Sequence, residues 1–393
     1  MAEFDPFDYE FHMDPAAYYA ALRRESPAAF NAKRKLWALS RYRDVQIALR
    51  DHDTFASGEG ASIEADAEMA AYLPPTGNIV DMDPPRHDQL RATVRHFFTP
   101  KAVAALEPHV REVVRSAIAE LGRKREGDLV VDFSQLVPLV IISDLLGVPT
   151  EDRTAMVDWT WEVHDRLPND DRMTSAGRLA AQHLHDKFAE LIAERRLAPK
   201  DDIVTSLARA AIGGIPLEDD QIIGIAFLLF LAGHDTTTQL IAQSISYLAS
   251  DPEARRLLAS EPERIPRAVE EFLRFISPIS MLARTTTRAV HIGGCDIPAK
   301  SRVMMLYGSA NRDESEFERP DVIDLDRKIR RHLAFGEGVH HCIGAPLARL
   351  EARVAIEEFL TSFPEFMLVG NPELGHFTLH HAIMTQRIVV DPR

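Results

Sequence analysis

Cysteine is scarce in this sequence, because Cys295 and Cys342 are its only two examples in 393 residues. Two cysteines are too few for a disulfide framework in a chain of this size, and such usage is typical of a reducing compartment. A basic, apolar leader is also missing, since the chain begins MAEFDPFDYEFHMD. No window reaches ~18 uninterrupted apolar residues. We therefore expect a cytoplasmic protein without a signal peptide or a membrane span.

Excess positive charge is absent as well. The chain has 60 acidic and 45 basic residues and a net charge of -15, which argues against nucleic acid as a partner of the whole surface. Internal repeats, low-complexity tracts and Gly/Ser linkers are missing too, so we expect one domain over residues 1–393. With 46% hydrophobic and 27% charged residues, the composition is that of a globular protein.

What the chain does contain is helical periodicity. Apolar residues recur at three- and four-residue spacing in most long segments, namely Pro15 to Arg24, Asp44 to Arg50, Arg86 to Phe98, Lys101 to Gly122, Ser175 to Ala198, Asp219 to Ser250 and Ala345 to Phe363. Short strand-like segments occur at Lys35 to Ser40, Ala289 to Ile292, Arg302 to Leu306 and Arg387 to Val390. We expect a mainly α fold with a minor β-sheet region. Two segments are predicted to be loops that could cover a pocket: Ser57 to Asn78 and Leu167 to Asp171.

The strongest motif surrounds the second cysteine. Residues 335–344 read Phe-Gly-Glu-Gly-Val-His-His-Cys-Ile-Gly, and a helical segment follows. This Gly-rich turn is expected to place Cys342 at a helix start, where unpaired backbone N–H groups and the helix dipole lower the pKa of a thiol. The glycines allow a tight turn and close approach to a flat ligand. The pattern suits a metal-bound thiolate.

Simpler interpretations of this cysteine stay open at this point. An isolated cysteine is more often a small buried hydrophobe than a ligand, and the His-His-Cys triplet could be an incidental cluster. A structural zinc site normally needs four nitrogen or sulfur ligands with paired spacings. Cys295 lies far from Cys342 and has no second cysteine nearby, so zinc is the weaker interpretation.

The full pattern, F-G-x-G-x-H-x-C-x-G followed by A-P-L-A-R, resembles the haem-binding loop of the cytochrome P450 family, and the resemblance extends across most of the chain. In that family a cysteine thiolate ligates haem iron and favours O–O cleavage. The resemblance implies haem b between the long central helix and the cysteine-bearing loop. It also implies that Cys342 is the axial ligand, that Phe335 shields its sulfur and that His340 reaches a haem propionate.

A second match interrupts the long apolar helix with Ala232-Gly233-His234-Asp235-Thr236-Thr237. In the simplest interpretation Thr236 bonds back to a helical carbonyl and Asp235 faces solvent or an ion-pair partner. The tract resembles the family's oxygen-binding helix, in which a glycine and a locally opened hydrogen-bond ladder make room for dioxygen. That resemblance implies Asp235 and Thr236 as catalytic residues that handle the protons of oxygen activation.

A third match is Glu271-Phe272-Leu273-Arg274, on a helix that Pro266 can start well. Taken alone, an i,i+3 ion pair is a surface feature worth ~0.3 kcal/mol. The tetrapeptide resembles the family's E-x-x-R element, a buried structural pair beneath the haem. Many relatives place an arginine near Val322 as a third partner, and Arg327 is the candidate substitute here.

The propionates of a haem need cations or hydrogen-bond donors. His87 and Arg91 stand four residues apart after Met82-Asp83-Pro84-Pro85 and resemble the family's propionate-binding helix, while Arg284 resembles another propionate ligand. Each taken alone is a typical surface residue. Together with His340 they form a consistent set.

The resemblance implies a monooxygenase that inserts one atom of O2 into an apolar organic substrate. No G-x-G-x-x-G fingerprint, flavin module or cysteine set for an iron–sulfur cluster is present, so NAD(P)H electrons are expected to come through a separate reductase and ferredoxin. A basic docking face is predicted from Arg330, Arg331, Arg349 and Arg353. A haem-binding sensor or carrier and a peroxide-driven oxygenase remain alternatives. The candidate pocket segments are Ser57 to Asn78, Gly224 to Leu231, Ile279 to Leu282 and the turn at Ala382 and Ile383.

Overall fold

The computed structural model describes residues 4–8, 10–11, 14–62, 75–165, 173–375, 377, 379 and 382–391. The predicted loop Leu167 to Asp171 lies outside these residues, as do positions 63–74 of the predicted loop Ser57 to Asn78.

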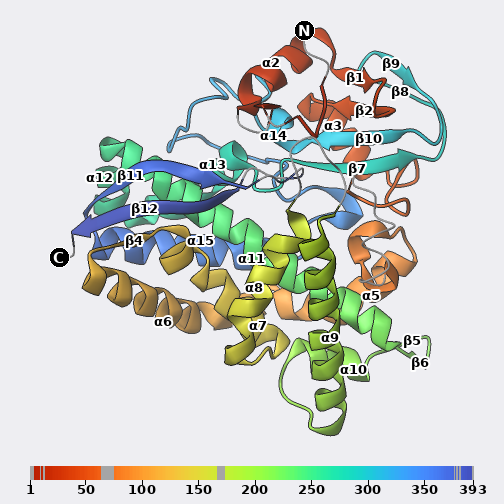
Figure 1. Ribbon diagram of the computed structural model, residues 1–393. Coiled ribbons are helices and arrows are strands. Elements are labelled where there is room, and N and C mark those ends of the chain that lie inside the picture. The colour runs from red at the N-terminus through yellow and green to blue at the C-terminus, as the bar shows by residue number, and fades with distance from the viewer. Residues whose placement is uncertain are drawn as a thin grey trace.

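The longest helix, α11 (Asp219–Ser250), crosses the middle of the molecule and organises the other helices (Figure 1). It begins at a capping box, in which the side chains of Glu218 and Gln221 satisfy each other's backbone N–H groups. Helices α6 (Pro100–Lys124), α7 (Leu136–Leu146) and α15 (Ala345–Ser362) pack along the same part of the molecule. Their buried faces form one continuous apolar core with α11.

Further helices surround this core. They are α2 (Pro15–Glu25), α3 (Tyr42–Arg50), α5 (Arg86–Val94), α8 (Arg153–His164), α9 (Ser175–Leu197), α10 (Ile203–Arg209), α12 (Pro252–Ser260), α13 (Ile265–Ile276) and α14 (Tyr307–Ala310). Short 3-10 turns that concern the site are η1 (Pro75–Gly77), η2 (Ile79–Asp81), η3 (Arg95–Phe98) and η7 (Gly338–His340). A π turn, η4 (Val130–Ser134), precedes α7.

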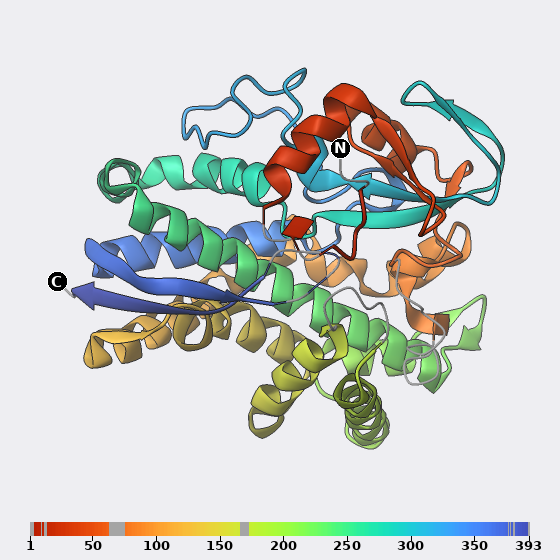
Figure 2. The same cartoon turned by 45° about the horizontal axis from the view of Figure 1, so that its top comes forward.

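The strands gather at two places beside the helices. One sheet has the order β1 (Ala28–Asn31), β2 (Leu36–Leu39), β10 (Arg302–Leu306), β7 (Met281–Thr286) and β3 (Phe55–Ala56). A second sheet joins β11 (Glu365–Leu374), β12 (Ile383–Asp391) and β4 (Glu126–Asp128), and two hairpins pair β5 (Ala211–Ile212) with β6 (Ile215–Pro216) and β8 (Val290–Ile292) with β9 (Cys295–Ile297). Figure 2 shows the first sheet above one end of α11 and the second sheet alongside its other end.

The predicted fold class is confirmed. Two predictions have the same bounds as in the structure, the helix Asp219 to Ser250 and the strand Arg302 to Leu306. The other predicted helices begin and end within about one turn of the helices in the structure. The predicted helix Arg86 to Phe98 divides into α5 and η3. Helix α7 was missed because its sequence, LVPLVIISDLL, is apolar almost all round and therefore carries no one-sided period.

Helix α11 is also the one described helix that is long and apolar enough to cross a membrane by length and composition. In the structure 72% of its most apolar window is buried inside the protein. Its hydrophobicity is therefore accounted for by the core that surrounds it.

Candidate active site

A cavity of about 250 Å³ lies between the middle of α11 and the loop that precedes α15. Leu229 and Thr236 face it from α11, and Phe335 and Cys342 face it from the loop. The predicted central helix and the predicted cysteine loop, 106 residues apart between Thr236 and Cys342, thus enclose one space. Its walls are mostly apolar side chains, as expected for a site that binds organic molecules.

The loop before α15 reaches this position through two glycines in the left-handed region. Gly336 has a φ of 63° and Gly338 a φ of 72°, a conformation that other residues adopt only with strain. A side chain at Gly338 would also meet the carbonyl oxygen of Leu49 at 2.4 Å, so the second glycine lets the loop lie against α3. The backbone N–H of Cys342 donates to the carbonyl of Phe335 at 2.9 Å, which closes the turn.

The side chain of Cys342 is accessible only in part and faces the cavity. The expectation of a lowered thiol pKa is wrong for this environment: burial raises the pKa of Cys342, although the backbone N–H groups of Gly344 and Ala345 and the charge of Arg91 act in the opposite direction. Desolvation of the sulfur therefore outweighs the effect of the helix start. A coordinated metal cation would supply the missing stabilisation of the thiolate.

Phe335 lines the cavity beside this cysteine. The guanidinium carbon of Arg349 lies 4.6 Å from the centre of its ring, on the face of the aromatic system. The ring of His332 lies 5.8 Å away, centre to centre. Phe335 is thus held between the loop backbone and a cation, in a position from which it can cover the sulfur.

The four predicted propionate-binding residues converge on the same cavity. His87, Arg91, Arg284 and His340 all line it, although they come from α5, β7 and η7. The rings of His87 and His340 lie 4.3 Å apart, centre to centre. Within the described part of the chain, neither arginine forms an ion pair with a carboxylate.

One buried polar atom in this cluster lacks a hydrogen-bond partner. Nε2 of His87 is buried without a hydrogen bond, while Nδ1 of the same ring contacts Asp88 at 2.8 Å. The guanidinium of Arg284 is only 3% exposed and donates to the carbonyl of Ala283. Unpaired buried cations and donors are costly, so the cluster fits a ligand that brings carboxylate groups into the cavity. The residues present therefore fit a haem with its two propionates.

His340 is neutral at physiological pH. Burial, followed by the charges of Arg284, His87 and Arg91, lowers the pKa of His340 to about 3. Its Nε2 lies 3.0 Å from the hydroxyl oxygen of Ser57. Ser57 is a contact that the sequence analysis did not assign, and no local motif marks it.

The two predicted catalytic residues of α11 are placed differently. Thr236 lines the cavity, and its hydroxyl donates to the carbonyl of Ala232 at 2.9 Å. This is the backbone hydrogen bond of the simplest interpretation, but the oxygen atom remains on the cavity wall. Asp235 is buried and is not among the described residues that line the cavity, so the alternative of a solvent-facing carboxylate is wrong.

The opened hydrogen-bond ladder implied by the resemblance is not observed, since α11 is α-helical from Asp219 to Ser250. Gly233 lines the cavity and also packs closely against α7. A side chain at this position would meet Cγ1 of Ile142 on α7 at 2.9 Å. The missing side chain therefore allows α7 to lie close to α11 at the height of the cavity.

Glu351 was missed by the sequence analysis. It lines the cavity from α15 and is only 1% exposed, and burial raises the pKa of this carboxyl well above its usual range. The signal was available, because Glu351 shares the apolar face of the helix with Leu347 and Val354 at i−4 and i+3. An acid on that face cannot point to water.

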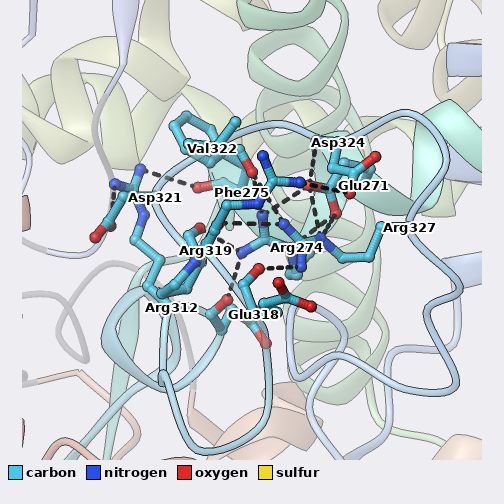
Figure 3. A network of polar contacts seen from close by, with 12 residues as sticks. Glu271, Arg274, Phe275, Arg312, Glu318, Arg319, Asp321, Val322, Asp324 and Arg327 are labelled. Atoms are coloured by element: carbon cyan, nitrogen blue, oxygen red, sulfur yellow. Dashed lines mark hydrogen bonds and ion pairs between the residues drawn. The ribbon is translucent and has the colours of Figure 1, made fainter.

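The E-x-x-R pair on α13 lies in a polar network with residues 311–327 (Figure 3). Glu271 and Arg274 are both 0% exposed and are joined by two hydrogen bonds of 2.8 Å. Nε of Arg327 lies 3.1 Å from each carboxylate oxygen of Glu271. Arg327 is thus confirmed as the third partner, and the backbone carbonyl of Val322 accepts from both arginines.

The predicted basic docking face is only partly available. Arg349 is paired with Glu270 at 2.6 Å, and Arg353 is paired with Glu107 at 2.7 Å. Arg331 lies 3.4 Å from Glu337. Arg330 is exposed and has no ion pair within the described residues, so the charge of this face is weaker than the count of arginines predicts.

The predicted pocket segments meet the cavity in part. Leu228 and Leu229 line it, as do Ile279 and Leu282. The prediction for Ala382 and Ile383 is wrong. Neither is among the described lining residues, because the backbone of Ile383 is held by Gln239 of α11 through hydrogen bonds of 2.8 and 3.1 Å, away from the cavity.

Comparison with known proteins adds independent observations. The sequence profile of the family described as Cytochrome P450 matches residues 29–374. Cytochrome P450 109 of Bacillus spizizenii is 36% identical over 88% of this chain and 84% of its own length. The vitamin D(3) 25-hydroxylase of Pseudonocardia autotrophica is 36% identical over 99% of this chain and 97% of its own length. The structure of CYP109E1 from Bacillus megaterium in complex with testosterone superimposes with a TM-score of 0.89, at 30% identity over 97% of this chain and 99% of that one.

Proposed function

Because the chain belongs to the cytochrome P450 family and is therefore a monooxygenase that uses haem b, we propose that Cys342 is its axial iron ligand and that the cavity beside Thr236 receives an apolar organic substrate. The observation that carries this proposal is the convergence of Cys342, four propionate-type residues and Thr236 on one cavity. When bound, the haem supplies the activation of dioxygen that the protein side chains cannot perform alone.

The chain's own residues hold the cofactor by charge and shape. Arg91 and Arg284 offer guanidinium groups to the propionates, and His87 offers its unpartnered Nε2. Phe335 covers the sulfur and, together with the loop backbone, keeps water from the thiolate. The cation of Arg349 on the ring face holds Phe335 in this position.

Proton delivery falls to Thr236, on the opposite wall, and to the adjacent Asp235 inside the protein. The Thr236 hydroxyl is anchored at the Ala232 carbonyl, so its oxygen is held at a fixed point on the cavity surface, where it can accept a hydrogen bond from a bound water. Asp235 is the adjacent buried carboxyl and is the residue we assign to passing protons toward that wall.

The substrate class follows from the cavity and the relatives. The α11 wall and the segment at Ile279 and Leu282 present aliphatic side chains, which bind by apolar burial rather than by charge. One relative is named as a hydroxylase of vitamin D(3), and one solved neighbour holds testosterone. We propose hydroxylation of a rigid, largely apolar lipid of that general size.

The electron donor is proposed to be a ferredoxin supplied by a reductase, in the cytoplasm. Arg330 and Arg331 are the exposed cations next to the cysteine loop, and an acidic protein would be attracted to them. Arg349 and Arg353 contribute less, because their charges are balanced by glutamates.

The deciding experiment is the carbon monoxide difference spectrum of the reduced protein. Thiolate ligation gives a red-shifted Soret band, which we expect in the wild type and not in Cys342→His. A red-shifted band in Cys342→Ala would sink the assignment of the ligand. Spectral titration with sterols, fatty acids and terpenes then tests the substrate class, and tight binding of a highly charged compound alone would contradict it.

A further inference from the structure

Two glycines far apart in the sequence, each a few residues before a segment that lines the cavity, meet backbone to backbone. Gly77 ends η1, and Gly224 lies in the second turn of α11. A side chain at Gly224 would lie 2.7 Å from Cα of Gly77, and one at Gly77 would lie 2.3 Å from the carbonyl oxygen of Gln221. Carbon atoms pack best at about 3.5–4.0 Å, so neither position has room for a methyl group.

The contact bears directly on the cavity wall. Ile79 and Val80, in the turn η2 that follows Gly77, line the cavity. Leu228 and Leu229, about one turn beyond Gly224 on α11, line it as well. The distance between η1 and α11 therefore determines how far these two pairs of apolar side chains stand apart.

The far end of this turn is fixed independently. Asp81 Oδ1 accepts from the backbone N–H of Ala61 at 2.6 Å. Residues next to Ala61 are held in turn, because Arg302 on β10 donates to the carbonyl of Gly60 at 2.7 Å. With Asp81 anchored to the sheet, a displacement at Gly77 is taken up by the residues between them, which are the ones facing the cavity.

We propose that the Gly77–Gly224 contact sets the width of the cavity over α11 and thereby selects the substrates that fit: these two glycines are specificity-determining positioning residues. The inference deepens the proposed function and rests on it, because the width matters only if this cavity receives the substrate. A methyl group at Gly224 has to move η1 outward by roughly 1 Å to restore ordinary contact. Helix α11 itself is not weakened, since alanine is a better helix former than glycine.

The test compares two azoles that ligate haem iron, 1-methylimidazole as a small probe and clotrimazole as a wide one, by spectral titration of the haem-loaded protein. In Gly224→Ala the ratio of the clotrimazole Kd to the 1-methylimidazole Kd should fall about tenfold, the range that one methylene-sized change in an apolar pocket produces. Gly77→Ala introduces the same strain from the other side of the contact. If Gly224→Ala does not fold, the ratio of the two Kd values in Gly77→Ala tests the proposal instead.

The matched control is Gly177→Ala. A side chain there would meet the carbonyl oxygen of Glu162 at 2.6 Å, which is comparable strain between α8 and α9, and no described residue of these helices lines the cavity. Its Kd ratio should equal that of the wild type. An unchanged ratio in the folded Gly77 and Gly224 variants, or an equal shift in Gly177→Ala, would overturn the proposal. The carbon monoxide band separates the two hypotheses, because its absence in the wild type would refute the proposed function and its presence leaves only the width in question.

Discussion

The cysteine side of the cavity, residues 333–351 with the buried α13 pair beneath them, is held by charged hydrogen bonds, whereas the α11 side is held by apolar packing. Glu271 makes bonds to Arg274 and Arg327 in full burial. On the α11 side Leu228, Leu229 and Ile79 line the cavity and belong to the apolar core or pack against it. Directional bonds between charges fix one geometry, while apolar packing tolerates changes that conserve volume. The cysteine side is therefore expected to be the more rigid of the two, and the α11 side can tolerate more variation.

The sharpest way to break the comparison is to remove a charge from the cysteine side. Arg274→Ala leaves the Glu271 carboxylate buried with less compensation, which costs about 3–5 kcal/mol of stability. We expect little folded, haem-loaded protein, measured as the yield of the carbon monoxide band and as the urea midpoint. Arg264→Ala, which removes partly exposed pairs with Glu261 and Asp326, is the control and should cost at most about 1 kcal/mol. Equal losses in both variants would contradict the structural role of the network.

Substitutions on the α11 side should change the rate and coupling of the reaction rather than the stability of the fold. Asp235→Asn is expected to slow turnover by up to ~10²–10⁴-fold, the range of general acid–base groups, with an intact carbon monoxide spectrum. Thr236→Ala should retain substrate binding but divert NADPH electrons to hydrogen peroxide. Product formed per NADPH is the measurement, and Thr236→Ser is the matched control because it keeps the hydroxyl. Wild-type coupling in Thr236→Ala would mean that protons bypass this threonine.

On the cysteine side, an arginine without an ion pair should affect docking of the electron donor more than an arginine that is paired with a glutamate. Arg330→Glu should slow reduction by an acidic ferredoxin about tenfold at low salt, because steering by charge accelerates association by roughly 10–10³-fold. Arg353→Gln should have less effect, since Glu107 and Glu357 already balance its charge. Stopped-flow reduction at several ionic strengths provides the measurement. Arg209→Glu, on the distant α10, makes the same change in net charge as Arg330→Glu, and an equal slowing there would argue against a local docking face.

Glu351 tests whether a buried acid on the cysteine side is neutral. Its pKa is raised by burial, so the unfolded chain releases this proton at lower pH than the folded protein does. The protonated carboxyl of Glu351 contributes to the stability of the fold at any pH below 4.5, the pKa of this group in the unfolded chain. That contribution is lost as pH rises toward the pKa of the group in the folded protein. Glu351→Gln should therefore become more stable relative to the wild type as pH increases from 5 to 8. A pH-independent difference in the free energy of unfolding would show that the carboxyl is already ionised.

Glu270 should show the opposite dependence. Burial would raise its pKa, but hydrogen bonds from His332 and Arg349 outweigh it and lower the pKa to about 2. The ionised carboxylate of Glu270 thus stabilises the fold at any pH above 4.5, the pKa of this group in the unfolded chain. The stabilisation is lost as pH falls toward the folded pKa of about 2. The stability difference between the wild type and Glu270→Gln should stay constant above about pH 5.5 and narrow below 4.5. Urea unfolding of both proteins at each pH measures this difference in the free energy of unfolding. A difference that increases as pH falls would contradict the lowered pKa of Glu270.

The sequence predicted the candidate site residues more completely than the other residues of the cavity wall. Cys342, Thr236 and the four propionate-type residues lie in short motifs, and all of them line the cavity. The pocket segment at Ala382 and Ile383 was wrong because a loop position does not reveal which way the chain turns. Glu351 was missed although it sits on an apolar helix face, because the helical period was followed through its apolar residues and the acid among them was not considered.

By itself the sequence determined the mainly helical class, the bounds of α11 and the candidate residues for the chemistry, because motifs and helical periodicity are local properties of the chain. Tertiary structure alone decided that Arg327 completes the buried pair, that Asp235 lies inside the protein and that Gly77 meets Gly224. Each of these depends on which segments lie side by side. The pKa of Cys342 belongs to the same group, since the helix start is visible in the sequence but the enclosure that outweighs it is not.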